Sequence, residues 1–141
     1  MPDAVIAALD LNSRRRLWRE ALSREPRPGY AVFVAEHNGA VVGFVSVGAW
    51  REGEEIVEDV GELFAIYVSP ERWGTGAGRA LIERAEWSMR ESGFTDARLW
   101  VLEGNERAER FYRAAGWKEN GRRVDIVRGA ELPELLYRRA L

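Results

Sequence analysis

The segment VSPERWGTGAGRALIERA, residues Val68 to Ala85, has glycine at three alternate positions directly before a run that looks helical. Each glycine costs backbone entropy on folding, so three in one short span need a reason. The first amides of a helix lack internal hydrogen-bond partners and carry the positive end of the helix dipole. Without Cβ atoms in the way, a phosphate can reach those amides. The pattern therefore predicts an anion-binding loop between a strand and a helix.

Two common phosphate-binding motifs do not fit this loop. The P-loop requires Lys and then Ser or Thr after its second glycine, whereas Gly78 is followed here by Arg79 and Ala80. The dinucleotide fingerprint GxGxxG, counted from Gly74, would need glycine in place of Arg79, and it would need a βαβ setting. Here strands typical of a hairpin precede the loop. A glycine-rich turn that binds no ligand remains the alternative.

Composition excludes several classes of function. The 141 residues, with 46% hydrophobic and 31% charged side chains and a formal net charge of -2, indicate a single domain over residues 1–141. That charge gives no reason to expect nucleic acid as the main partner. With no cysteine and one histidine, we expect neither a thiolate nucleophile nor a metal site built from cysteines or a histidine cluster. No signal-peptide layout and no membrane-length apolar run is found, so we expect a soluble, cytoplasmic protein without membrane contact.

Hydrophobic periodicity predicts the order of elements along the chain. Helices are expected over residues 12–25, from the glycine loop to about Ser92, and over 105–116, while residues 4–9 fit a short helix or a strand. Strands are expected over 30–50 with a hairpin turn at His37-Asn38-Gly39, and over 62–68, 97–102, 117–127 and 134–141. Residues 51–61 are predicted to form an acidic loop. This order predicts an α+β (mixed α/β) fold with helices flanking a mixed, mostly antiparallel sheet.

Two segments resemble motifs of one family, the GNAT N-acetyltransferases. VSPERWGTGAGRAL resembles motif A, in which a strand leads through [Q/R]-x-x-G-x-[G/A] into the helix that binds acetyl-CoA. Gly76 and Gly78 match its last two fixed positions, and Trp73 stands where Gln or Arg is usual. NERAERFYRAAGW resembles motif B, N-x-x-A-x-x-x-Y-x-x-x-G-[FW], which is matched by Asn105, Ala108, Tyr112, Gly116 and Trp117. The resemblance covers the chain from about Tyr30 to its C-terminus.

The resemblance implies acetyl-CoA as co-substrate and no metal. The pyrophosphate would lie on the glycine loop, formed by Gly74, Thr75, Gly76, Ala77, Gly78 and Arg79. The pantetheine arm would bind like an extra strand to the main chain of Ile66, Tyr67 and Val68. The family's sheet splays at that point, and Asn105 would help to line the opening.

The implied reaction is direct attack of an amine on the thioester. An ammonium ion cannot attack, so a base must first remove its proton. Glu62 is the candidate base, with Glu58 or Asp59 acting through water as alternatives. Tyr112 is the candidate acid for the leaving thiolate, although its helical spacing also fits an ordinary core residue.

The resemblance implies a primary amine of a small molecule as acceptor, because Trp100 stands where protein N-terminal acetylases of the family carry glutamate. An acyl-CoA-binding regulatory domain without turnover is the alternative within the fold. A structural or partner-binding domain is the alternative outside it. The family's first strand is not evident, and an open sheet edge would invite pairing with another chain, which leaves a homodimer open.

Overall fold

The computed structural model describes residues 29–141. The expectations for residues 4–9 and 12–25, and for the missing first strand, lie outside the described residues. The elements are β1 Ala31–His37, β2 Ala40–Glu52, β3 Glu55–Val68, the short 3-10 helix η1 Pro70–Arg72, α3 Ala77–Glu91, β4 Asp96–Leu102, α4 Glu106–Ala114, β5 Lys118–Val127 and β6 Ala130–Ala140.

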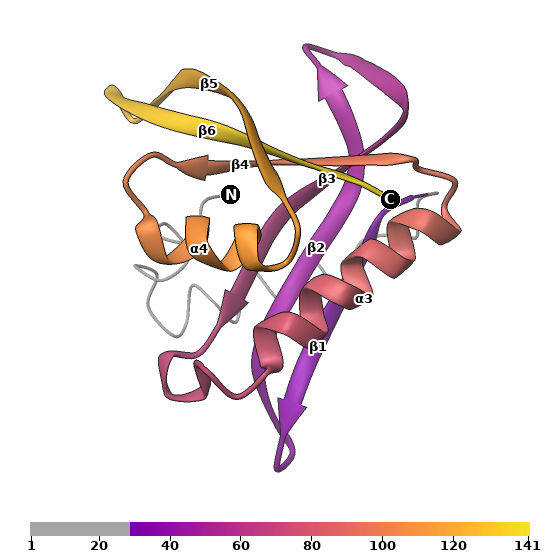
Figure 1. Cartoon of the computed structure of the whole chain (residues 1–141), viewed down its shortest axis with the longest axis vertical. Coiled ribbons are helices and arrows are strands. Elements are labelled where there is room, and N and C mark those ends of the chain that lie inside the picture. Colours follow the sequence, from indigo (N-terminus) through magenta and orange to yellow (C-terminus); the bar gives the residue numbers. More distant parts are fainter. Residues whose placement is uncertain (1–28) are drawn as a thin grey trace.

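The described strands form one sheet with the order β1-β2-β3-β4-β6-β5. Every neighbouring pair is antiparallel except β3 and β4, which are parallel. Both helices lie on the same face of this sheet, as Figure 1 shows, and their apolar stripes share one core. Buried Leu81, Ala85 and Met89 of α3 meet buried Ala108 and Tyr112 of α4 in that core. The predicted mixed, mostly antiparallel fold is therefore confirmed.

Local signals in the sequence mark the ends of several elements correctly. The β1–β2 hairpin turns at Asn38 and Gly39, whose φ angles of 52° and 80° suit a type I′ turn. Gly93 and Gly116 follow the two helices with φ angles of 90° and 94°, a conformation that favours glycine at helix C-termini. These turns fix where each helix and strand can pack.

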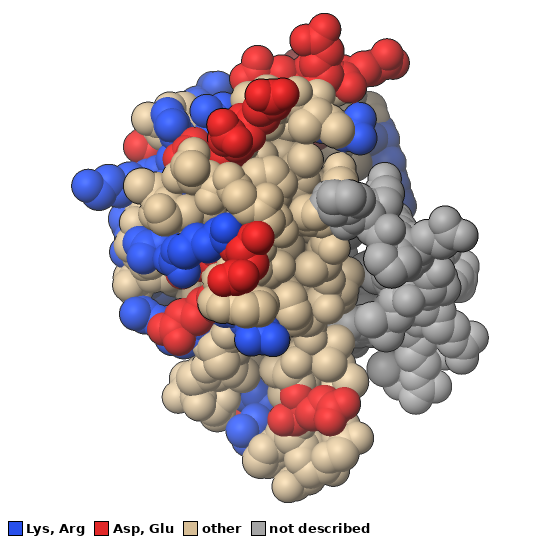
Figure 2. Space-filling view, turned by 90° about the vertical axis from the view of Figure 1, so that its right-hand side faces the viewer, with Lys and Arg blue, Asp and Glu red and all other residues tan. Residues whose placement is uncertain are grey.

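The prediction of an acidic loop over residues 51–61 is wrong. β2 continues to Glu52 and β3 already begins at Glu55, so this segment is the end of a long hairpin. Residues 51–56 are exposed, and a ribbon that buries neither face needs no alternation of apolar and polar residues. The periodicity therefore gave no strand signal there. Acidic side chains gather at the end of the molecule where this hairpin projects (Figures 1 and 2).

The sheet opens between β3 and β4. Their parallel pairing covers only residues 60–62 of β3 against residues 96–98 of β4. Beyond Glu62, β3 runs on to Val68 while β4 stays paired with β6 on its other side. A β-bulge at Phe64, which has no register partner on β2, adds to the divergence. In the described residues, the edge of β3 that faces β4 has no strand partner over residues 63–68, as the predicted splay requires.

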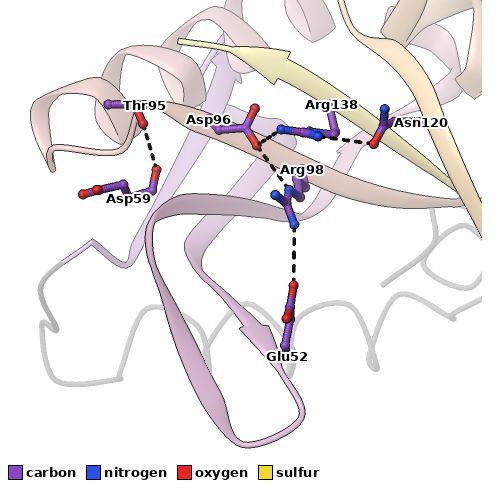
Figure 3. Close-up of polar contacts among 7 residues, drawn as sticks. All are labelled: Glu52, Asp59, Thr95, Asp96, Arg98, Asn120 and Arg138. Carbon is purple, nitrogen blue, oxygen red and sulfur yellow. Dashed lines mark hydrogen bonds and ion pairs between the residues drawn. The ribbon is translucent and has the colours of Figure 1, made fainter.

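Polar contacts hold the paired end of β4 in place (Figure 3). Asp96 accepts hydrogen bonds from Arg98, at 3.2 Å, and from Arg138 of β6, at 3.0 Å. Arg98 also lies 3.8 Å from Glu52 at the end of β2. The Thr95 amide donates to the carbonyl oxygen of Asp59 over 2.8 Å. These contacts tie β2, β3 and β6 to β4 at the closed end of the opening.

Candidate functional site

The glycine loop has the backbone of an anion-binding turn. After Pro70 starts the 3-10 helix, Gly74 and Gly76 adopt φ angles of 76° and 90°, which side chains other than glycine rarely tolerate. Gly76 is the N-terminal cap of α3. The Thr75 hydroxyl donates to the carbonyl oxygen of Arg72 over 2.6 Å and braces the loop. Strand, glycine loop and helix N-terminus thus come together as the sequence predicts.

A cavity of about 280 Å³ opens beside this loop, at the splayed end of β3. Seven of the residues expected at the cofactor line it: Ile66, Tyr67, Val68, Gly74, Gly76, Gly78 and Arg79. Five further residues that the sequence did not single out for the cofactor complete the lining: Arg72, Trp73, Arg107, Ala108 and Phe111. The cavity lies between the end of β3, the loop and the first turns of α4.

Three expected cofactor residues do not line the cavity. Thr75 and Ala77 belong to the loop but have no part in the lining. Asn105 caps α4 as predicted, since its side-chain oxygen accepts the Ala108 amide over 3.3 Å. This bond positions Ala108, which does line the cavity, so the structure assigns Asn105 a capping role.

The glycines of the loop serve different purposes. A Cβ atom added at Gly78 would lie 3.1 Å from Phe111, so this glycine allows α3 to approach α4 closely. At Gly76 no side chain of residues 29–141 lies within 4 Å of such a Cβ, and only its φ of 90° requires glycine. Since Gly76 lines the cavity, a Cβ there would meet open space.

We expect Gly76→Val to raise the dissociation constant of acetyl-CoA at least tenfold, about 1.4 kcal/mol. The branched Cβ would occupy the ligand's space and disfavour the loop conformation. The matched control is Gly93→Val, since Gly93 has the same φ of 90° and the same open surroundings at the far end of α3. Calorimetry should find weaker binding only in the Gly76 variant. Equal affinities in the two variants would contradict a phosphate site on this loop.

Glu62 lies on the face of the sheet opposite the helices. Its neighbours Gly61 and Leu63 face α3, because a Cβ on Gly61 would touch Met89 and Leu63 belongs to the shared core. Glu62 itself pairs in register with Gly48 of β2 and Arg98 of β4, at the last step before the strands separate. The candidate base therefore sits at the closed end of the opening.

Burial raises the pKa of Glu62 from 4.5 to about 7. That value already includes smaller effects of nearby charges, since Arg123 lowers the pKa and Glu134 raises it. Arg98, although adjacent in register, is engaged with Asp96 and Glu52 (Figure 3). A carboxyl group with a pKa near 7 is suited to exchange a proton at neutral pH.

Two tryptophans enclose the face around Glu62. The rings of Trp50 on β2 and Trp100 on β4 stack with centroids 5.9 Å apart. Since β3 lies between these strands, the stack crosses β3. Trp100 is two residues from Arg98, the register partner of Glu62, so the stack lies on the Glu62 face. Arg123 lies over the Trp100 ring at 4.0 Å and pairs with buried Glu134 over 3.0 Å. Glu62 and Trp100 stand out in the sequence, but only the strand order brings Trp50, Arg123 and Glu134 together with them.

Tyr112 is a core residue and does not line the cavity. It is only 3% exposed, and its ring packs against Phe111, Trp117 and Tyr137 with centroids 5.4 to 6.3 Å apart. Its neighbours on α4, Ala108 and Phe111, do line the cavity. Tyr112 therefore lies directly behind the cavity wall. This position is compatible with a core residue and with an acid that reaches the thiolate through its hydroxyl.

Residues 29–141 contain neither a metal-binding cluster nor a membrane-spanning helix. No cluster of three or more histidine, cysteine or acidic side chains that could hold a metal ion occurs there. Within the same range, no helix has the length and apolar character needed to cross a membrane.

The sequence pattern of the Acetyltransferase (GNAT) family matches residues 5–117. An uncharacterized N-acetyltransferase of Mycobacterium bovis is 33% identical over 123 residues, which are 87% of this chain and 73% of that protein. Another from Bacillus subtilis, YuaI, is 43% identical over 75 residues, which are 52% of this chain and only 42% of that protein.

Solved structures share the fold. One of them is yncA of Salmonella typhimurium, named as an acetyltransferase and solved with its cofactor acetyl-CoA. The two structures superpose with a TM-score of 0.71 at 26% sequence identity. The match covers 94% of this chain and 74% of the yncA chain.

Proposed function

We propose, since this chain belongs to the Acetyltransferase (GNAT) family, that it transfers the acetyl group of acetyl-CoA to a primary amine of a small molecule. One observation carries this proposal. A cavity joins the glycine loop at the N-terminus of α3 to the unpaired edge of β3. The loop offers amides to a diphosphate and the strand offers main-chain groups to a pantetheine arm.

In the proposed reaction, the amine nitrogen attacks the thioester carbonyl carbon and the carbon–sulfur bond breaks. Glu62 takes the proton that the acceptor ammonium must lose. As the amide forms, the nitrogen loses a second proton to solvent. Tyr112 gives a proton to the departing thiolate and regains one from solvent before the next turnover, so the reaction needs no metal. Because Glu62 faces away from α3, the acceptor would approach from the sheet face that carries Trp50 and Trp100.

The second candidate function is binding of an acyl-CoA without turnover. The burial of Tyr112 outside the cavity lining favours it, because a general acid must reach the sulfur. A thiol-release assay with acetyl-CoA and a broad panel of small amines separates the two. We expect thiol release that depends on the amine, with the acetylated product identified by mass spectrometry. Acetyl-CoA binding without thiol release from any amine would favour the binding domain.

A further inference from the structure

Trp73 and Arg107 form a contact at the wall of the cavity. The indole N–H of Trp73 donates to the carbonyl oxygen of Val68 over 2.9 Å, which fixes the ring against the end of β3. The guanidinium carbon of Arg107, on α4, lies 3.2 Å from the centroid of that ring. Both residues line the cavity, and Trp73 directly precedes Gly74 in the sequence. Two distant segments thus place a cation at the entrance of the glycine loop.

We propose that Arg107, held over the ring of Trp73, binds the diphosphate of acetyl-CoA in place of the Gln or Arg side chain usual at position 73. The inference rests on the proposed function, because it concerns the same cavity. A guanidinium over an indole can still donate from its edge to phosphate oxygens, while the ring restrains its position. Trp73 is then a positioning residue and Arg107 a binding residue.

The position of Arg107 in its helix supports a ligand-binding role. It lies in the first turn of α4, beside Glu106, where the helix dipole disfavours a positive charge. The dipole of α4 therefore makes a positively charged Arg107 unfavourable. An anion bound in the cavity would make the same charge favourable.

The other two arginines of the cavity complete the argument. Arg79 is committed to the protein, since it donates to Glu83 over 2.9 Å and to the carbonyl oxygen of Ala114 over 3.3 Å. Arg72, by contrast, has a buried Nε with no acceptor among residues 29–141. Arg72 and Arg107 thus place two guanidinium groups at the wall of one cavity.

The test measures dissociation constants of acetyl-CoA, acetyl-3′-dephospho-CoA and acetyl-pantetheine by calorimetry. We expect Arg107→Gln to weaken acetyl-CoA and its dephospho form equally, by about tenfold or more, because a charge-assisted hydrogen bond is lost. Binding of acetyl-pantetheine, which has no phosphate, should not change. Trp73→Leu should also weaken acetyl-CoA, while the double variant should bind no worse than Arg107→Gln alone, because Trp73 acts through Arg107.

Arg110→Gln is the control, because Arg110 is exposed on the same helix and does not line the cavity. It should bind all three ligands like the wild type. An unchanged affinity in Arg107→Gln, in a protein that binds acetyl-CoA normally, would overturn this inference and leave the proposed function intact. If Arg107→Gln weakens binding of acetyl-CoA but not of acetyl-3′-dephospho-CoA, Arg107 binds the 3′-phosphate. That result would overturn the diphosphate assignment. Failure of the wild type to bind acetyl-CoA would overturn both.

Discussion

Glu62→Gln is expected to lower the rate of acetyl transfer near neutral pH by roughly 10²-fold, the usual loss when a positioned base is removed. Glutamine keeps the shape of the side chain and cannot accept the proton. Acetyl-CoA affinity should stay close to that of the wild type, since Glu62 does not line the cavity. The rate should recover partly at high pH, where the amine is already neutral. Steady-state rates over a range of pH give the answer.

The pKa of Glu62, about 7, determines the shape of the wild-type profile. A base works when it is deprotonated, so kcat/KM should rise as pH increases through about 7, and Glu62→Gln should abolish that rise. The raised pKa also means that the folded protein favours the protonated carboxyl. Stability should therefore fall as pH rises from about 4.5 to about 7. Glu62→Gln should consequently melt higher than the wild type at pH 8 and at the same temperature at pH 4.

The exposed Glu58 on the same strand provides the control. Glu58→Gln should change neither the rate nor the pH profile. An unchanged profile in Glu62→Gln together with a lost rate in Glu58→Gln would transfer the role of base to Glu58, acting through water.

Tyr112→Phe is expected to reduce turnover by about 10- to 10³-fold with acetyl-CoA affinity nearly intact, because the hydroxyl matters most as charge develops on sulfur. Phenylalanine keeps the ring and its packing against Phe111, Trp117 and Tyr137. The melting temperature should change little. Rate, affinity and melting temperature measured on this one variant separate the catalytic interpretation from the core interpretation.

Tyr137→Phe is the matched control within the same aromatic group. The Tyr137 hydroxyl donates to Glu109 over 3.0 Å and accepts from Arg113 over 3.1 Å, so it serves to attach β6 to α4. Its loss should lower the melting temperature and leave turnover largely unchanged. A full rate in a stably folded Tyr112→Phe would rule out the acid assignment.

Features that depend on a few neighbouring residues could be predicted from the sequence. The Asn38-Gly39 turn, the Asn105 cap and the glycines after both helices follow from local backbone chemistry. The glycine loop could be predicted for the same reason. Residues 51–61 were misassigned because residues 51–56, at the end of that hairpin, are exposed and carry no periodic pattern.

Features that join distant segments required the structure. The Trp50–Trp100 stack depends on β3 lying between β2 and β4, and no periodicity of the single chain reveals that order. The contact between Trp73 and Arg107 depends on how α4 packs beside the glycine loop. The sequence shows that position 73 departs from the family motif, but only the packing shows that Arg107 lies over the ring of Trp73.

The central claim is that acetyl-CoA occupies the cavity between the glycine loop and the splayed edge of β3. Amide hydrogen exchange followed by mass spectrometry, with and without acetyl-CoA, tests it most directly. We predict that acetyl-CoA slows exchange over residues 66–68 and 74–79, whose amides would bind the pantetheine arm and the diphosphate. Exchange in the β2–β3 hairpin end, residues 51–56, should not change. If saturating acetyl-CoA leaves exchange over residues 66–79 unchanged, or slows it only elsewhere, the result would contradict the account.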